Sequence, residues 1–118
     1  MKIESIFKRD FSKMPFELEK ITDAVLKAML SVQKGDVKAA EKISMSIYET
    51  LLDRKQNTPS YVPNVEEIQD LVEQKLMKSE FLDVAKAYIL YRDQQAQKRK
   101  RDIFEKRISL KPYEYPEL

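Results

Sequence analysis

The chain has 118 residues, of which 36% are charged and 42% are hydrophobic, and its formal net charge is +2. This length suits one domain with one hydrophobic core, and the apolar content is too high for a generally disordered chain. The sequence contains no Cys and no His, which excludes disulfides, thiolate zinc sites, thiol nucleophiles and imidazole bases.

The first residues predict a β-hairpin. Residues 3–9 are rich in β-branched and aromatic side chains, a composition that favours a strand. Asp10-Phe11-Ser12 can turn the chain, because Asp is favoured at the first position of a turn. Lys13 to Phe16 then form a short return strand. The predicted turn contains no Gly to supply a positive φ.

Two helices are expected next. The first begins near Glu17 and stops at Gly35 in the C′ position. Asp36 caps the second, which ends where Gln56 to Pro63 supplies two prolines. Within that break, Ser60–Val62 is a candidate third strand. The residues expected to face inward are Leu18, Ile21, Ala24, Val25, Ala28, Met29 and Val32 from the first helix, and Val37, Ala40, Ile43, Ile47, Tyr48 and Leu51 from the second.

Two further helices complete the predicted fold. Asn64 and Glu67 form a capping box that opens the third helix, and the fourth follows Lys78-Ser79-Glu80. The fourth turns polar from Arg92, and we expect it to continue as an exposed helix to about Arg107. The inward residues are Ile68, Leu71, Val72 and Leu76 in the third helix, and Val84, Ala87, Tyr88 and Tyr91 in the fourth.

These elements predict an α+β fold, in which four helices pack as a bundle capped by a small β-sheet built on the N-terminal hairpin. From Leu110 on, the two prolines of the tail predict an extended linker to a downstream domain. No apolar run approaches the roughly 20 residues of a membrane span. The first residues also lack the apolar region of a signal peptide. We therefore expect a cytoplasmic protein with no membrane partner.

Three cations near the head of the first helix form the best candidate for an anion site. Lys8 and Arg9 are adjacent, so on a strand they point to opposite faces and one of them can face the fold. Lys20 lies on the first turn of the first helix, where backbone N–H groups already favour anions. A polyphosphate needs several charged donors of this kind. These residues alone leave open that the hairpin is simply solvated and charged.

In their order and spacing, several segments resemble the ATP-cone, the nucleotide-sensing module of ribonucleotide reductases. The segments are Ile6-Phe7-Lys8-Arg9-Asp10, Pro15-Phe16, Lys20-Ile21, Val65–Glu73 and Val84–Arg92. The resemblance covers about residues 3–98. It implies a nucleotide-binding domain at 1–98, followed at 99–118 by a basic helix end and the linker. The tail around Tyr113 to Pro116 favours a chain taken from the N-terminus of a radical-generating small subunit.

The resemblance also implies roles for individual residues. Lys8, Arg9 and Lys20 hold the nucleotide phosphates, and Ile6 and Ile21 flank the nucleotide. Family members usually carry Gly after the Lys-Arg-Asp, whereas this chain has Phe11, so the turn is expected to differ.

Four more candidates come from the third and fourth helices. Val65 and Gln69, at the head of the third, are placed to touch the base or sugar, and Gln offers both a donor and an acceptor to an adenine edge. The resemblance implies that the fourth helix lines the nucleotide cleft, where we favour Tyr91 and Arg92 over Tyr88. For Ile68, Leu71 and Val72 we favour core packing.

By resemblance, the expected function is regulatory and not enzymatic. ATP or dATP, accompanied by Mg²⁺, acts as an allosteric effector of an attached ribonucleotide reductase. dATP inhibits by driving a homo-oligomer, and the other reductase subunits are the expected partners.

The alternative is a helical interaction module that binds an acidic partner or nucleic acid through the basic run Lys98–Arg101. Asp102 and Glu105 dilute that run, so nucleic acid is not favoured. No paired carboxylates stand in a recognisable catalytic arrangement. A single Gly in the chain excludes a Walker or Rossmann phosphate loop.

Overall fold

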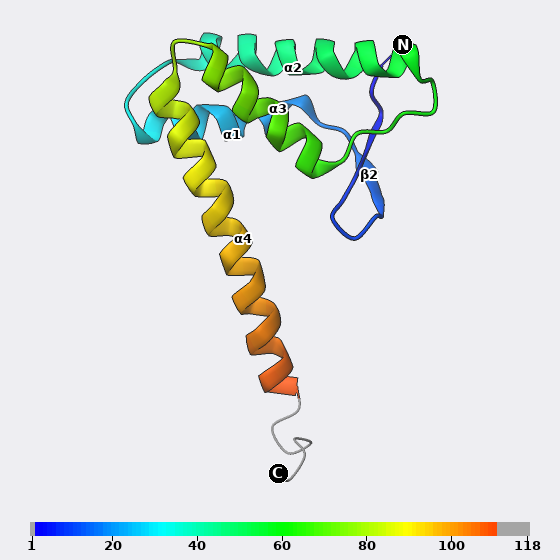
Figure 1. Ribbon diagram of the computed structural model, residues 1–118, viewed down its shortest axis with the longest axis vertical. Coiled ribbons are helices and arrows are strands. Elements are labelled where there is room, and N and C mark those ends of the chain that lie inside the picture. The colour runs from blue at the N-terminus through cyan, green and yellow to red at the C-terminus, as the bar shows by residue number, and fades with distance from the viewer. Residues whose placement is uncertain (1, 111–118) are drawn as a thin grey trace. The chain divides into compact units, whose positions relative to one another are not determined.

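The computed structural model of the chain describes residues 2–110, with side chains as far as residue 106. Within this range the chain forms two strands and four helices, which is the predicted α+β arrangement (Figure 1). The elements are β1 (Ser5–Phe7), β2 (Lys13–Pro15), α1 (Leu18–Ser31), α2 (Val37–Asn57), α3 (Val65–Lys78) and α4 (Leu82–Leu110). The linker predicted from Leu110 on falls almost wholly on residues 111–118, which lie outside the described residues.

The chain divides into two compact units, residues 1–88 and 89–118. Residues 82–88 of α4 belong to the first unit, and the rest of α4 belongs to the second. Among residues 2–110, no helix combines the length and the apolar character that crossing a membrane requires.

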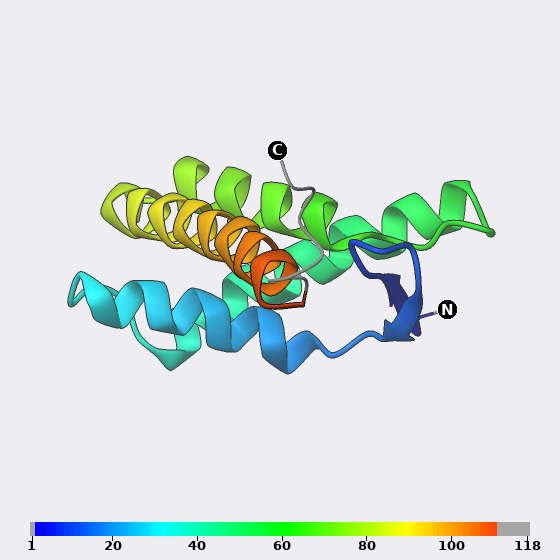
Figure 2. The same ribbon diagram turned by 90° about the horizontal axis from the view of Figure 1, so that it is seen from below.

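The core of the first unit lies between α1, α2, α3 and the start of α4. α1 and α3 run in the same direction and α2 runs against them, so that the first turns of α1 and α3 both lie beside the hairpin (Figure 2). The residues predicted to face inward supply most of the buried side chains. Those buried in the helices are Ile21, Val25, Ala28, Met29, Ala40, Ile43, Ser44, Ile47, Leu51, Ile68, Leu71, Val72, Leu76, Val84, Ala85 and Tyr88.

Two residues predicted to face inward are exposed. Val37, the first residue of α2, is 51% exposed, because the inward face of that helix begins only at Ala40. Tyr91 is 53% exposed. Ala85, which was not predicted to face inward, is fully buried beside Val84.

The hairpin is shorter than predicted. β1 and β2 pair antiparallel over three residues each, with Ile6 opposite Met14. The strand predicted at residues 3–9 covers only Ser5–Phe7, so Lys8 and Arg9 lie in the turn. The turn is closed by a hydrogen bond from the N–H of Lys8 to the carbonyl of Ser12 (2.8 Å).

Phe11 stands at the tip of this hairpin in the left-handed conformation, with φ of 69°. That conformation costs an L-residue roughly 1–2 kcal/mol, and glycine tolerates it best. The expectation that the turn differs from that of the family stays a prediction, and Phe11 takes a backbone shape that a Gly would adopt without strain.

The end of α1 differs from the prediction. A Schellman motif closes the helix: the N–H of Lys34 donates to the carbonyl of Met29 (2.9 Å), and the N–H of Gln33 donates to that of Leu30 (3.2 Å). The C′ residue is therefore Gln33, with φ of 56°, and not Gly35. Gly35 is needed for a different reason. A Cβ there would lie 2.5 Å from the sulfur of the buried Met29, and its φ is 78°.

The predicted helix starts are confirmed for α2 and α3. Asp36 accepts a hydrogen bond from the N–H of Ala39 (2.8 Å), and Asn64 and Glu67 form the complete capping box. The predicted third strand at Ser60–Val62 is wrong. The described chain there pairs with the hairpin through a single bridge between Phe7 and Asn64, supported by a hydrogen bond from the Phe7 N–H to the carbonyl of Pro63 (2.9 Å).

Candidate functional site

An apolar cleft of about 220 Å³ opens in the first unit where the hairpin meets the helix bundle. Its walls come from the hairpin, the first turns of α1 and α3, and Tyr88 of α4. The residues that line it are Ile6, Met14, Pro15, Phe16, Glu17, Lys20, Ile21, Ala24, Val65, Ile68, Gln69, Val72 and Tyr88.

The composition of this cleft suits a flat ring system. Most of its walls are aliphatic or aromatic, and Gln69 places a side-chain amide among them. The cleft is smaller than the roughly 300–1,000 Å³ of sites that enclose a whole drug-sized ligand. A ligand with one ring system can therefore bury that ring here, while any charged part of it lies outside.

The rim of the cleft carries cations and the N-terminus of a helix. Within the described residues, no side chain caps the start of α1, whereas Asp36 and Asn64 cap the starts of α2 and α3. The carboxylate of Glu17, in the N-cap position, instead pairs with Lys20 (3.0 Å). Backbone N–H groups at a helix start attract anions. The start of α1 and Lys20 thus bring N–H donors and a cation to one side of the rim, where Lys20 is already paired with the carboxylate of Glu17.

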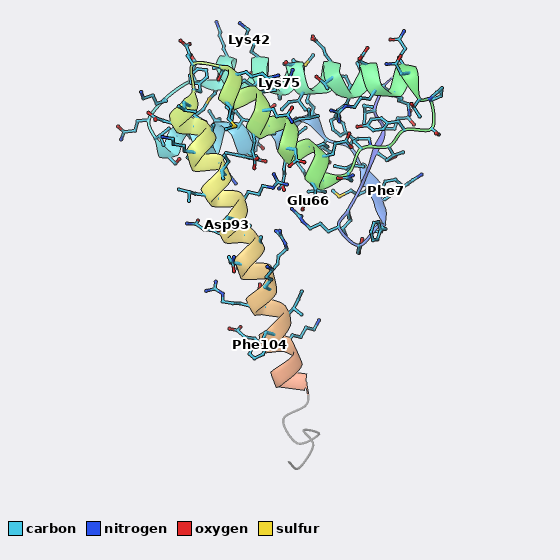
Figure 3. All side chains as sticks on the ribbon, in the orientation of Figure 1. Phe7, Lys42, Glu66, Lys75, Asp93 and Phe104 are labelled. Atoms are coloured by element: carbon cyan, nitrogen blue, oxygen red, sulfur yellow. The ribbon has the colours of Figure 1, made fainter. Side chains whose placement is uncertain are left out.

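A second depression, which we call the charged hollow, adjoins the cleft at Val65. It is lined by Phe7, Lys8, Arg9, Phe11, Asn64, Val65 and Glu66. Figure 3 shows Phe7 on the hairpin and Glu66 at the start of α3, two of the residues that line this hollow. Lys8 and Arg9 therefore lie on the side of the hairpin turn that faces the start of α3.

Arg9 connects the hairpin to α3. Its Nε atom donates to Glu66 Oε1 (2.8 Å), and its Nη2 atom donates to Gln69 Oε1 (3.2 Å). Glu66 lines the charged hollow and Gln69 lines the cleft. The guanidinium of Arg9 thus stands where the two depressions meet. Lys8 and Arg9 thus both line the charged hollow, and Arg9 hydrogen-bonds to α3.

The start of α3 is fixed by a network behind the cleft. The carboxylate of Glu67 accepts hydrogen bonds from Arg54 of α2 and from the hydroxyl of Tyr61. Its other oxygen accepts from the backbone N–H of Asn64 (3.3 Å) and completes the capping box. Burial, together with the hydrogen bond to Glu67, raises the pKa of Tyr61 to about 12. Tyr61 therefore remains a hydrogen-bond donor at neutral pH, and the wall that carries Val65 and Gln69 is held in place.

The structure gathers seven of the nine predicted site residues in the first unit. Five of them line the cleft, and Lys8 and Arg9 line the charged hollow. Val65, one of the five, lines both depressions. The five are Ile6, Lys20, Ile21, Val65 and Gln69. Tyr91 and Arg92 belong to the second unit, and their contact with a nucleotide stays a prediction.

Sequence reasoning missed or set aside four residues that the structure brings to the site. Tyr88, ranked below Tyr91, lines the cleft and is 5% exposed. Ile68 and Val72 are core residues, as favoured, and also form the floor of the cleft. Glu66 was not considered. It lies in the Val65–Glu73 segment of the resemblance, but an acidic residue two positions after the N-cap is common in any helix.

Among the described residues, no three acidic side chains gather in a way that could hold a metal ion. The expected Mg²⁺ was assigned to the nucleotide phosphates, and that assignment stays a prediction.

Comparison with known proteins identifies the domain. Residues 4–97 match the ATP cone domain. The chain is 47% identical over 96 residues to the vitamin B12-dependent ribonucleoside-diphosphate reductase of Thermoplasma acidophilum, covering 77% of this chain and 12% of the relative. It is 34% identical over 104 residues to the anaerobic ribonucleoside-triphosphate reductase of Haemophilus influenzae, and the match covers 87% of this chain and 14% of that relative. The corresponding enzyme of Escherichia coli is 32% identical over 97 residues, and the match covers 81% of this chain and 13% of that relative.

The chain therefore belongs to the ATP cone domain family, as the sequence motifs predicted. It spans only 12% to 14% of the length of these relatives, all of which are named as ribonucleotide reductases. The matched domain is the regulatory, nucleotide-binding part of such enzymes. That this chain precedes a radical-generating small subunit stays a prediction.

Proposed function

We propose that this chain binds ATP and dATP as allosteric effectors, with the adenine ring in the apolar cleft and the phosphates over its cationic rim. One observation carries the proposal. Within the residues that match the ATP cone domain, a cleft of ring size adjoins Lys8, Arg9 and Lys20, which come from two separate elements. Apolar walls suit a base, and converging cations suit a polyphosphate.

The proposed roles follow from position. Ile6, Ile21 and Val65 bury the faces of the ring, and the amide of Gln69 hydrogen-bonds an edge of it. Lys8, Arg9 and Lys20 bind phosphate oxygens, assisted by the N–H groups at the start of α1. Mg²⁺ arrives with the phosphates and neutralises part of their charge. Tyr91 and Arg92 are proposed as further contacts from the second unit.

The proposed consequence is regulation of an attached ribonucleotide reductase. ATP and dATP differ by one ribose hydroxyl, so the switch has to rest on different affinities of the two effectors for two states of the parent protein. We propose that dATP favours an inactive oligomer of the parent and that the interface includes other reductase subunits. Tight binding alone cannot shift such an equilibrium.

A calorimetric titration with ATP, dATP and Mg²⁺ tests the binding step. We expect binding without hydrolysis. At about 100-fold above its dissociation constant, a nucleotide stabilises the fold by about 2.7 kcal/mol and raises the melting temperature by several degrees. Absence of both heat and a melting shift would rule out the proposal. Indifference to nucleotide, combined with steeply salt-dependent binding of nucleic acid, would favour the interaction-module alternative instead.

Light scattering on the full-length parent tests the regulatory step. We expect a larger and inactive assembly with dATP than with ATP. Identical masses with ATP, with dATP and without nucleotide, together with unchanged reductase activity, would reduce the chain to a binding domain without a regulatory role.

A further inference from the structure

We propose that Glu66 is a specificity-determining residue of this site, because its carboxylate holds Arg9 and sets how much phosphate charge a ligand needs in order to bind that arginine. This inference rests on the proposed function and deepens it. It concerns selectivity among nucleotides that share a base and differ in the number of phosphates.

The geometry places Glu66 in direct competition with a phosphate. Arg9 makes a charge-assisted hydrogen bond of 2.8 Å to Glu66 and a second bond of 3.2 Å to Gln69. Glu66 and Gln69 are three residues apart, so they project from the same face of α3. The guanidinium binds planar oxygen pairs best, and here the two acceptors of α3 engage its Nε and one Nη. A phosphate that binds Arg9 through the same edge, formed by Nε and Nη2, has to displace the oxygens of Glu66 and Gln69.

The pair is exposed enough to be exchanged. The side chains of Arg9 and Glu66 keep 36% and 52% of their surface accessible. An exposed ion pair of this kind changes an equilibrium constant by only a few-fold. A triphosphate, with several negative charges, can therefore outcompete one carboxylate. A monophosphate or a small anion has much less charge with which to offset the loss.

Gln69 links this competition to the cleft. The oxygen of its side-chain amide accepts from Arg9, and Gln69 also lines the ring-sized cleft. When a phosphate takes Arg9, this oxygen loses its donor and becomes available as an acceptor for the ring. Phosphate binding and base binding are thereby coupled through two residues of α3.

The competing explanation is that Glu66 only stabilises the helix. An acidic side chain in the first turn of α3 interacts favourably with the helix dipole. Glu67, the next residue, already provides the capping box. A purely structural Glu66 would make Glu66→Gln slightly less stable and would leave nucleotide affinity unchanged. The proposed role predicts that affinity rises even though stability falls slightly.

The test is calorimetry of ATP, ADP, AMP and adenosine, in constant salt and Mg²⁺, against the wild type, Glu66→Gln and the matched control Glu49→Gln. Glu49 is an exposed carboxylate of α2 outside both depressions. We expect Glu66→Gln to tighten ATP binding by about 3- to 10-fold, to tighten AMP less and to leave adenosine unchanged. Glu49→Gln should leave all four affinities unchanged.

A double-mutant cycle with Arg9→Met decides whether Glu66 acts through Arg9. We expect the gain from Glu66→Gln to disappear in the Arg9→Met background. A gain that persists there would mean that the carboxylate repels phosphates directly, and it would overturn the inference. So would an unchanged or weakened ATP affinity in Glu66→Gln alone. These outcomes require a wild type that binds ATP, so they are distinct from failure of the proposed function, in which the wild type binds no adenine nucleotide.

Discussion

The start of α3 and the hairpin turn form opposite walls of the site and are built in different ways. The start of α3 is held from behind by Glu67, which contacts α2 through Arg54 and the preceding loop through Tyr61. The hairpin has two strands of three residues and passes through a left-handed Phe11. Its described hydrogen bonds to the region around α3 are made by Phe7 to Pro63 and by Arg9 to Glu66 and Gln69.

Because of this difference, the two walls contribute different things to the site. The α3 wall supplies a fixed surface, since Glu67 anchors it to Arg54 and Tyr61, and these three residues line neither the cleft nor the charged hollow. The hairpin wall supplies the cations Lys8 and Arg9, and its main side-chain attachment runs through the cation that a phosphate would bind. Ligand binding should therefore alter the hairpin more than α3.

The α3 wall can be broken by Glu67→Ala. The substitution removes the reciprocal half of the capping box, while the backbone N–H of residue 67 still donates to Asn64. It also takes away the shared charged partner of Arg54 and Tyr61. We expect a loss of about 2–3 kcal/mol in the free energy of unfolding, because hydrogen bonds to a charged group are worth about 1.5–3 kcal/mol. This corresponds to a melting temperature lower by about 10–20 °C in circular dichroism.

Glu49→Ala is the control for that change, because it removes an exposed carboxylate of α2 and should stay within about 0.5 kcal/mol of the wild type. If Glu67→Ala and Glu49→Ala had the same melting temperature, the α3 wall would not depend on the hydrogen bonds of Glu67.

Alanine substitutions of the cations should weaken the binding of nucleotide phosphates. Lys8→Ala and Lys20→Ala should each reduce triphosphate affinity about 10- to 100-fold, because each removes a charge-assisted hydrogen bond worth about 1.5–3 kcal/mol. Arg9→Ala and Lys20→Ala should fall at the lower end of that range, since Arg9 is paired with Glu66 and Lys20 with Glu17 before a phosphate binds. Lys100→Ala, in the second unit, should change little in the same titration. An equal effect of Lys100→Ala and Lys20→Ala would show that the site is misplaced.

The α3 wall was largely predictable from the sequence because the residues that determine it are close together in the chain. Asn64 and Glu67 are three residues apart, and the apolar spacing of α3 identified its buried face. The same applies to the cap of α2 at Asp36. Arg54 and Tyr61 were not foreseen as supports of that wall, because nothing local indicates that they meet at Glu67.

The charged side of the site was only partly predictable. The resemblance to a family selected Lys8, Arg9 and Lys20, but it gave no partner for them. The pair between Arg9 and Glu66 joins residues 57 positions apart, and charge patterns along a chain do not specify such contacts. Tyr88 and Tyr91 share one helical face, so spacing could not rank them. The burial of Tyr88 and its position on the cleft separate the two.

The strain at the hairpin tip can be relieved at Phe11. This side chain is 86% exposed, so its removal loses little burial, whereas its φ of 69° is costly for a large residue. Phe11→Asn should stabilise the domain by up to about 1 kcal/mol, because Asn tolerates this conformation. Phe11→Gly should gain less, because Gly has more freedom to lose on folding.

Urea denaturation of Phe11→Ala provides the control for these variants. Alanine removes the ring but keeps the strained backbone, so it should show no comparable gain. If Phe11→Ala and Phe11→Asn were equally stable, ring exposure and not backbone strain would account for the difference from the wild type.

The smallest expected effect concerns Asp10, which closes the same turn. The pKa of Asp10 lies below its ordinary value of 3.8, because its carboxylate accepts hydrogen bonds from the hydroxyl of Ser12 (2.6 Å) and from the N–H of Ser12 (3.0 Å). A lowered pKa in the folded state means that the carboxylate stabilises the fold above pH 3.8. The contribution is lost as pH falls through the folded-state pKa.

Asp10→Asn keeps a side-chain acceptor in the turn and removes only the charge. The wild type should therefore be slightly more stable than Asp10→Asn at neutral pH, and the gap in urea midpoint should close as the pH is lowered below 3.8. The gap should be small because Asp10 is fully exposed. In a Ser12→Ala background the lowered pKa loses its largest cause, the hydroxyl, so the pH dependence of the gap should weaken. A gap that stayed constant down to acidic pH would mean that the charge of Asp10 has no part in holding the hairpin wall.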